Sequence, residues 1–175
     1  MKPVLSAVCC LALCAMPALG QKHAAKAGAA GAAMTDQQFI DFAAQTDMVE
    51  ANLGQMAASV GASDEVKNYG QTLTSDHTQD FNELYKVAQQ ANLTRPDAIG
   101  AEQNKAMIDP FQKLKGAAFD KKYIHEMIAG HTKAIAVYKK EANDAQNAAV
   151  KSYAESALPT LQKHLDNAKA LEKAK

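Results

Sequence analysis

Three histidines and one glutamate supply the residue types from which this chain could build a metal site. His77, His131, His164 and Glu50 each lie near the middle of a different amphipathic segment. At about 100° of rotation per residue, Glu50 and His77 lie on the apolar stripes of their segments, and His131 and His164 lie toward one side of theirs. Imidazoles and a carboxylate that converge from four helices suit a divalent transition metal such as zinc, copper, iron or manganese. Asp80 shares the face of His77 and is a candidate fifth ligand or a hydrogen-bond partner of a ligand.

The same residues also fit a structural polar layer that fixes how the helices align. In such a layer His77 donates a hydrogen bond to Asp80 or Tyr138, and either His131 or His164 holds Glu50. A lone Glu50 in the core would be costly or would become protonated. If about 40% of a helix surface faces inward, three of four helical histidines do so by chance in roughly one case in five. The structural layer is therefore the leading interpretation, and the metal site is the alternative.

Other chemistry is poorly represented in the sequence. A di-iron site uses Glu-x-x-His pairs, but Thr74, Ile128 and Leu161 stand three residues before the three candidate histidines. The sequence contains neither a Gly-x-Ser-x-Gly nucleophile motif nor a glycine-rich phosphate loop before a helix. We therefore expect a protein that is not an enzyme.

Methionines offer a weaker hypothesis, copper(I) binding through thioethers. Met48, Met56 and Met127 lie in the helical segments, but methionine at helical spacing more often fills gaps in a core. His125 points away from the apolar face of its segment, and we expect it to be solvated.

The first 20 residues have the pattern of an export signal. Lys2 precedes an apolar run over residues 4–13, and small residues follow up to Gly20, after which we expect cleavage. The chain's three cysteines all lie in this segment, so the mature chain would form no disulfide. Residues 21–34 are rich in alanine and glycine and predict a flexible linker. The apolar run falls short of the roughly 20 residues that span a bilayer, and we expect no transmembrane span in the mature chain.

The rest of the chain, residues 35–175, predicts an all-α domain. Apolar residues recur at helical spacing over residues 36–60, 63–92, 117–143 and 147–173, and no segment alternates like a half-buried strand. The first two and the last two helices are joined by short turns, which predicts two antiparallel hairpins. The longer connection over residues 93–116, with a short helix expected at 101–108, permits either a ferritin-type crossover or a simple up-down turn. Pro159 should kink the last helix and point outward.

Four stretches of this sequence resemble a known family. They are MVEANLGQMAA, LTSDHTQDFNEL, GAAFDKKYIHEMIAGHTKAIAVYKKEA and YAESALPTLQKHLDNAKAL. They are similar to the bacterial exported family called domain of unknown function 4142, over nearly all of residues 36–171. The resemblance implies a ferritin-like four-helix bundle in the periplasm or associated with the outer membrane, and it carries no settled activity.

These observations favour an exported, non-enzymatic bundle of the cell envelope, with a role in stress tolerance. The alternative is a metal-binding ferritin-like protein whose ligands are Glu50, His77, His131 and His164. A third alternative, a module that binds an envelope protein or a second copy of itself, requires an exposed apolar patch, which we would expect on residues 93–116. The chain has 19 basic and 19 acidic residues, and this balance argues against a nucleic-acid partner.

Overall fold

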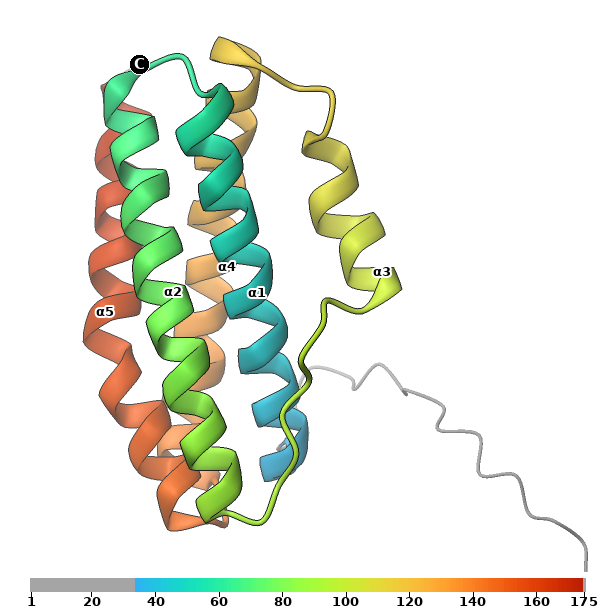
Figure 1. The fold of residues 1–175 in the computed structure, drawn as a ribbon. Coiled ribbons are helices and arrows are strands. Elements are labelled where there is room, and N and C mark those ends of the chain that lie inside the picture. Colours follow the sequence, from blue (N-terminus) through green and yellow to red (C-terminus); the bar gives the residue numbers. More distant parts are fainter. Residues whose placement is uncertain (1–33, 175) are drawn as a thin grey trace, which may run out of the picture. The chain divides into compact units, whose positions relative to one another are not determined.

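The computed structural model describes residues 34–174, whose four long helices pair into two antiparallel hairpins (Figure 1). Helices α1 (Asp36–Val60) and α2 (Asp64–Gln90) form the first hairpin. Helices α4 (Gly116–Asp144) and α5 (Ala148–Lys173) form the second. The described residues contain no β-strand beyond an isolated bridge between Gly61 and Gly116. The predicted all-α four-helix bundle is confirmed, and each helix begins and ends within about two residues of its predicted bounds.

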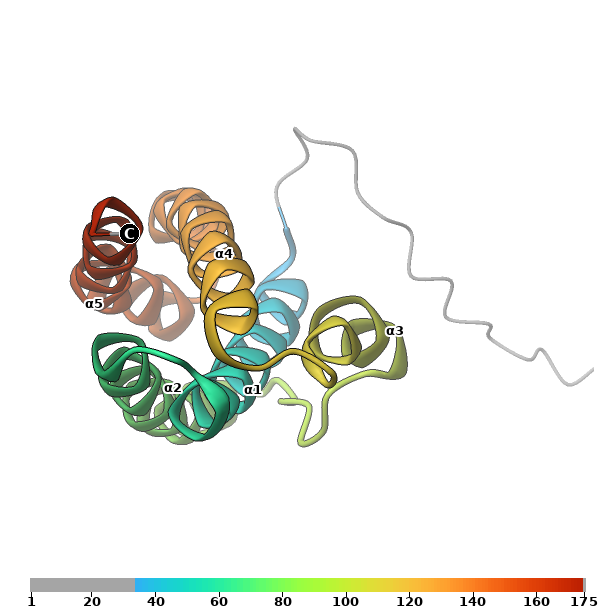
Figure 2. The ribbon, with the colours of Figure 1, turned by 90° about the horizontal axis from the view of Figure 1, so that it is seen from above.

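The connection between the hairpins has the crossover topology that the sequence left open. It contains α3 (Ala101–Gln103), the π-helical turn η1 (Asn104–Ile108) and the 3-10 turn η2 (Asp109–Phe111), close to the predicted short helix. It lies outside the four-helix core, beside α1 (Figure 2). Since Gly116 bridges to Gly61, α4 begins at the end of the bundle where α1 ends. Helices α2 and α4 therefore run parallel, as in ferritin-like bundles.

Each hairpin turn is held by a carboxylate from the other hairpin. Asp120 of α4 accepts hydrogen bonds from the backbone N–H groups of Ala62 and Ser63, at 2.9 and 3.2 Å. Asp36 of α1 accepts from the backbone N–H groups of residues 146 and 147, at 2.9 and 2.8 Å. These carboxylates satisfy donors that helix starts leave free. Because they join opposite hairpins at both ends, they fix the level at which the helix midpoints meet.

The apolar core is divided into two clusters along the bundle axis. One cluster includes Phe39, Leu84 and Tyr138, and the other includes Leu53 and Phe119. On α2 and α4 the candidate metal ligand lies in sequence between the residues of the two clusters. On α1 and α5, Glu50 and His164 lie next to Val49 and Leu165, the residues at which one cluster ends or the other begins. The candidate residues therefore form a polar layer between two apolar clusters.

The connection does not carry the apolar patch that a partner-binding module would need. Ile108 and Phe111 are buried against the bundle. Within residues 34–174, the large apolar side chain that stands exposed is Tyr85 on α2. Pro159 is exposed, as predicted, and α5 continues through it as one helix.

The predicted export signal and nearly all of the predicted linker lie outside the described residues. No helix among the described residues is long and apolar enough to cross a membrane.

Candidate metal centre

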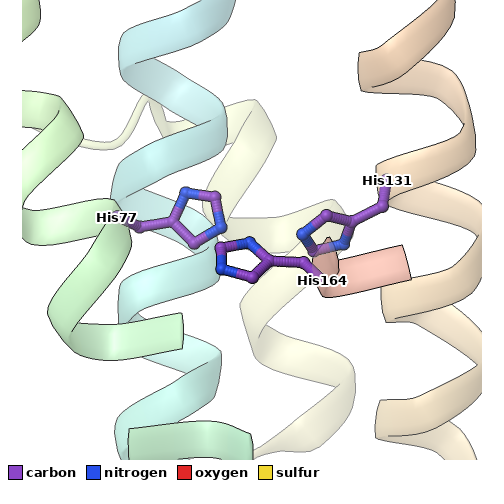
Figure 3. A group of neighbouring side chains, drawn as sticks. All are labelled: His77, His131 and His164. Carbon is purple, nitrogen blue, oxygen red and sulfur yellow. The ribbon is translucent and has the colours of Figure 1, made fainter. Parts of the chain in front are cut away.

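Three histidines from three helices point toward one another at the middle of the bundle (Figure 3). His77 of α2, His131 of α4 and His164 of α5 are 3%, 0% and 1% exposed. One ring nitrogen from each lies within 4.8 Å of those of the other two. Ligands of a tetrahedral metal at 2.0–2.1 Å would be about 3.3 Å apart. A bound ion would therefore draw the three nitrogens inward by a small amount.

Glu50 brings a carboxylate from the fourth helix, α1. Its Oε2 lies 3.0 Å from His77 Nε2 and 3.1 Å from His131 Nε2, and the residue is 4% exposed. Gly130 of α4 makes room for it, because a Cβ atom added there would lie 3.2 Å from Glu50 Oε1. The structure thus brings together, at one level, the four residues that the sequence singled out.

Each histidine uses its other ring nitrogen in a hydrogen bond outside the cluster. The pairs are His77 Nδ1 with Asp47 Oδ1, His131 Nδ1 with the Met127 carbonyl oxygen, and His164 Nε2 with Asp76 Oδ2, each at 2.9 Å. In a neutral imidazole, a ring N–H donated to a carboxylate or carbonyl leaves the opposite nitrogen with a free lone pair, and it fixes the ring orientation. Metal-binding histidines almost always have such a partner.

The atoms that face the middle of the cluster have no hydrogen bond of their own. They are His77 Nε2, His131 Nε2, His164 Nδ1 and Glu50 Oε2. The contacts of Glu50 with His77 and His131 have ion-pair distances but not the direction of a hydrogen bond. Buried polar atoms without a hydrogen bond are uncommon in folded proteins. Four of them from four helices make a donor set suited to a transition metal.

Burial and neighbouring charges divide the cluster into charged and neutral groups. Burial by itself would raise the pKa of Glu50, but His131 and His77 outweigh burial and lower this pKa below its ordinary value. Burial likewise opposes the charge on His77, yet Glu50 and Asp47 raise its pKa to about 10. Burial lowers the pKa of His131 and brings that of His164 to about 4. At neutral pH the cluster therefore holds an anionic Glu50, a cationic His77 and two neutral imidazoles.

Asp80 has a different partner from the one expected. It accepts a hydrogen bond at 2.8 Å from the Tyr153 hydroxyl, which lies 3.3 Å from the Tyr138 hydroxyl. The prediction that His77 donates a hydrogen bond to Asp80 or Tyr138 is wrong, because His77 Nδ1 is hydrogen-bonded to Asp47 instead.

The sequence reasoning missed the two carboxylates that orient histidines. Asp47 lies three residues before Glu50, so both share one face of α1, and this spacing could have revealed it. Asp76 immediately precedes His77 on α2, and its side chain is 35% exposed. His125 is exposed, as predicted. Met48 and Met56 pack as partly buried side chains against the two apolar clusters.

Solved structures share this fold at low sequence identity. CopM in a Cu(II)-bound form matches with a TM-score of 0.67 and 17% identity, over 82% of this chain and 99% of that chain. CopM in an Ag-bound form matches with a TM-score of 0.65 and 16% identity, over 81% of this chain and 97% of that chain. A dodecameric thioferritin, the bacterioferritin-related protein from Bacteroides fragilis, matches with a TM-score of 0.63 and 10% identity. The match covers 79% of this chain and 83% of that chain.

Comparison at the level of sequence gives a family and no individual relative. No curated protein matches the chain. A family model described as a domain of unknown function matches residues 21–171. The chain therefore belongs to the DUF4142 family.

Proposed function

We propose that this protein binds one transition-metal ion through His77, His131, His164 and Glu50. The observation that carries the proposal is the set of hydrogen bonds at 2.9 Å that holds the three imidazoles by their outer nitrogens. A polar layer that only fixed helix register would be expected to use inward nitrogens for hydrogen bonds as well. Here those nitrogens make no hydrogen bond, and Glu50 Oε2 meets two of them at ion-pair distances only.

Copper(II) and zinc are the ions that this ligand set favours. Three imidazoles and one carboxylate are nitrogen and oxygen donors of intermediate softness, and copper and zinc bind such sites most strongly among the common divalent ions. The CopM structures of the same fold are described as Cu(II)-bound, Cu(I)-bound and Ag-bound. Iron(II) and manganese(II) bind a given site of this kind more weakly than copper(II), and oxygen-rich sites suit manganese better.

The site suits holding a metal better than catalysis. Four protein ligands complete a tetrahedral shell, whereas a catalytic zinc site keeps one position for water or substrate. The ligands are at least 96% buried, so an ion held there would be shielded from most reactants. We infer a non-enzymatic role in which the protein, exported to the cell envelope, sequesters a metal ion and so contributes to tolerance of metal stress.

Elemental analysis of the purified protein tests the proposal. After incubation with copper(II), zinc, iron(II) or manganese(II) and removal of unbound ion, we expect about one copper or zinc per chain. The His77→Ala/His131→Ala double variant should lose it, and His125→Ala, which removes an exposed histidine, should retain it. Retention of folding is checked by circular dichroism. Absence of metal in the wild-type protein would leave the cluster as a structural polar layer.

A further inference from the structure

A groove between α2 and α5 leads from the protein surface to the histidine cluster. It has a volume of about 340 Å³, and its floor includes His77 and His164. Both residues are at most 3% exposed, and each has a ring nitrogen without a hydrogen bond. The groove therefore reaches two of the proposed metal ligands through the gap between the two hairpins.

The side chains along this groove suit a cation. Asp76, Asp80 and Glu83 line one wall on α2, and hydroxyls of Tyr153, Ser156 and Thr160 line the other on α5. No lysine or arginine is among the residues that line it. Lys86 lies 2.7 Å from Glu83 at the mouth and offsets part of that charge. Carboxylates along a low-dielectric cleft concentrate cations and raise their association rate.

A second groove approaches the cluster from the α1 side. It is also lined by carboxylates, but the cationic side chain of Arg95 packs on one of its lining residues, Phe81. It has a volume of about 350 Å³ and includes Asp47, His77, Phe81 and Asp97. On this side Asp47 already holds His77 Nδ1. The guanidinium of Arg95 lies 3.4 Å from the centre of the Phe81 ring, so a positive charge stands at this opening. A metal cation approaching here would be repelled by this positive charge.

We infer that the groove between α2 and α5 is the route by which the metal ion reaches the cluster. This inference rests on the proposed function. Glu83 is exposed and attracts the ion at the surface, Asp80 is a partly buried residue of the groove lining, and Asp76 lies beside His164 at the inner end. Asp76 thus has two roles, since it orients His164 and lies on the path of the ion.

Stopped-flow measurement of metal uptake by the purified protein tests the route, with copper(II) or zinc added alone. Thr160→Trp places a bulky side chain in the α2/α5 groove, and Thr78→Trp does the same in the α1-side groove. Both threonines are exposed helical positions. We expect Thr160→Trp to slow uptake, because its side chain narrows the groove, with the final metal content unchanged, and Thr78→Trp to leave the rate unchanged.

Charge reversal gives an independent measurement. Glu83→Lys should lower the uptake rate about tenfold at low ionic strength, and added salt should reduce the difference. Asp97→Lys, at the other groove, should have little effect. If wild-type protein takes up metal but Thr160→Trp and Glu83→Lys do so at the wild-type rate, the route is overturned and the metal site stands. If wild-type protein takes up no metal, the proposed function itself fails.

Discussion

Asp76 Oδ2 lies 2.9 Å from His164 Nε2 and joins α2 to α5 across the interface between the two hairpins. His164 is 1% exposed, whereas the side chain of Asp76 is 35% exposed. The carboxylate thus holds the buried imidazole from the solvent side. It directs the His164 Nδ1 lone pair toward His77 and His131, and we expect the affinity of the proposed metal site to depend on it.

Removal of this carboxylate should weaken metal binding without loss of a ligand. In Asp76→Asn the amide is a weaker acceptor and no longer stabilises the tautomer with hydrogen on Nε2. We expect the dissociation constant for copper(II) or zinc to rise about 10- to 100-fold, measured by competition with a chelator. Asp166→Asn, an exposed aspartate on α5, is the control. An unchanged affinity in Asp76→Asn would show that His164 does not need this partner.

A substitution at Gly130 tests the metal affinity of the site separately from the folding stability of the protein. In Gly130→Ala the new Cβ would lie 3.2 Å from Glu50 Oε1 and displace this carboxylate from the cluster. We expect metal affinity to fall about tenfold, which corresponds to about 1.4 kcal/mol. Alanine is the better helix former, so the metal-free protein should not lose helicity.

The matched control for that substitution is Gly100→Ala, where a Cβ atom would lie 3.7 Å from Gln45 Oε1 and meet no closer atom. Equal affinities of the two variants and wild type, by the same chelator competition, would mean that Glu50 is not a ligand.

Metal binding should release about one proton per ion at pH 7. The His77 pKa is raised to about 10, so the ion must displace a proton from this imidazole. His131 and His164 have lowered pKa values and are neutral at pH 7, so they release none. Affinity should therefore fall as the pH falls, and more steeply near pH 4, where His164 also takes up a proton.

Isothermal titration calorimetry in buffers of different ionisation enthalpy measures this proton count. His125→Ala removes an exposed histidine and should leave the count unchanged. A count of zero at pH 7 would contradict the assignment of a charged His77.

Glu141 provides a prediction away from the cluster. The residue is 1% exposed, neither of its carboxyl oxygens makes a hydrogen bond of normal geometry, and burial raises its pKa. A raised pKa means that the folded protein favours the protonated acid. This contribution to stability is fully present below the unfolded-state pKa and is lost as the pH rises through the folded-state pKa.

Glu141→Gln should therefore raise the free energy of unfolding at pH 7 by about 1 kcal/mol and change it little at pH 4. Urea denaturation at the two pH values measures the difference. Glu155→Gln, at an exposed position of α5, should have no effect at either pH. Destabilisation of Glu141→Gln at pH 7 would show that the carboxylate is stabilised where it lies, with the Met34 N–H contributing.

The sequence by itself determined the helices and the residues that meet in the middle of the bundle. Apolar periodicity, the capping residues Thr35 and Ser63 and the short turns fixed the helix bounds. Glu50 and His77 lie on apolar stripes, and all four candidate ligands lie near helix midpoints. Because short turns force hairpins, midpoints meet at one level in any topology, so the cluster could be predicted before its surroundings were known.

Only the tertiary structure decided the topology and the hydrogen-bond partners of the histidines. Either course of residues 93–116 satisfies the helix pattern, and the crossover is visible only in the position of Gly116 beside Gly61. Asp47, Asp76 and Asp80 all lie within one turn of a candidate ligand along the sequence, yet Asp47 and Asp76 hold histidines and Asp80 holds Tyr153. A hydrogen bond requires its two atoms to lie within about 3 Å of each other. Rotation of a helix about its axis by less than the angle between successive residues is enough to make or break such a hydrogen bond. The packing of the two hairpins sets this rotation.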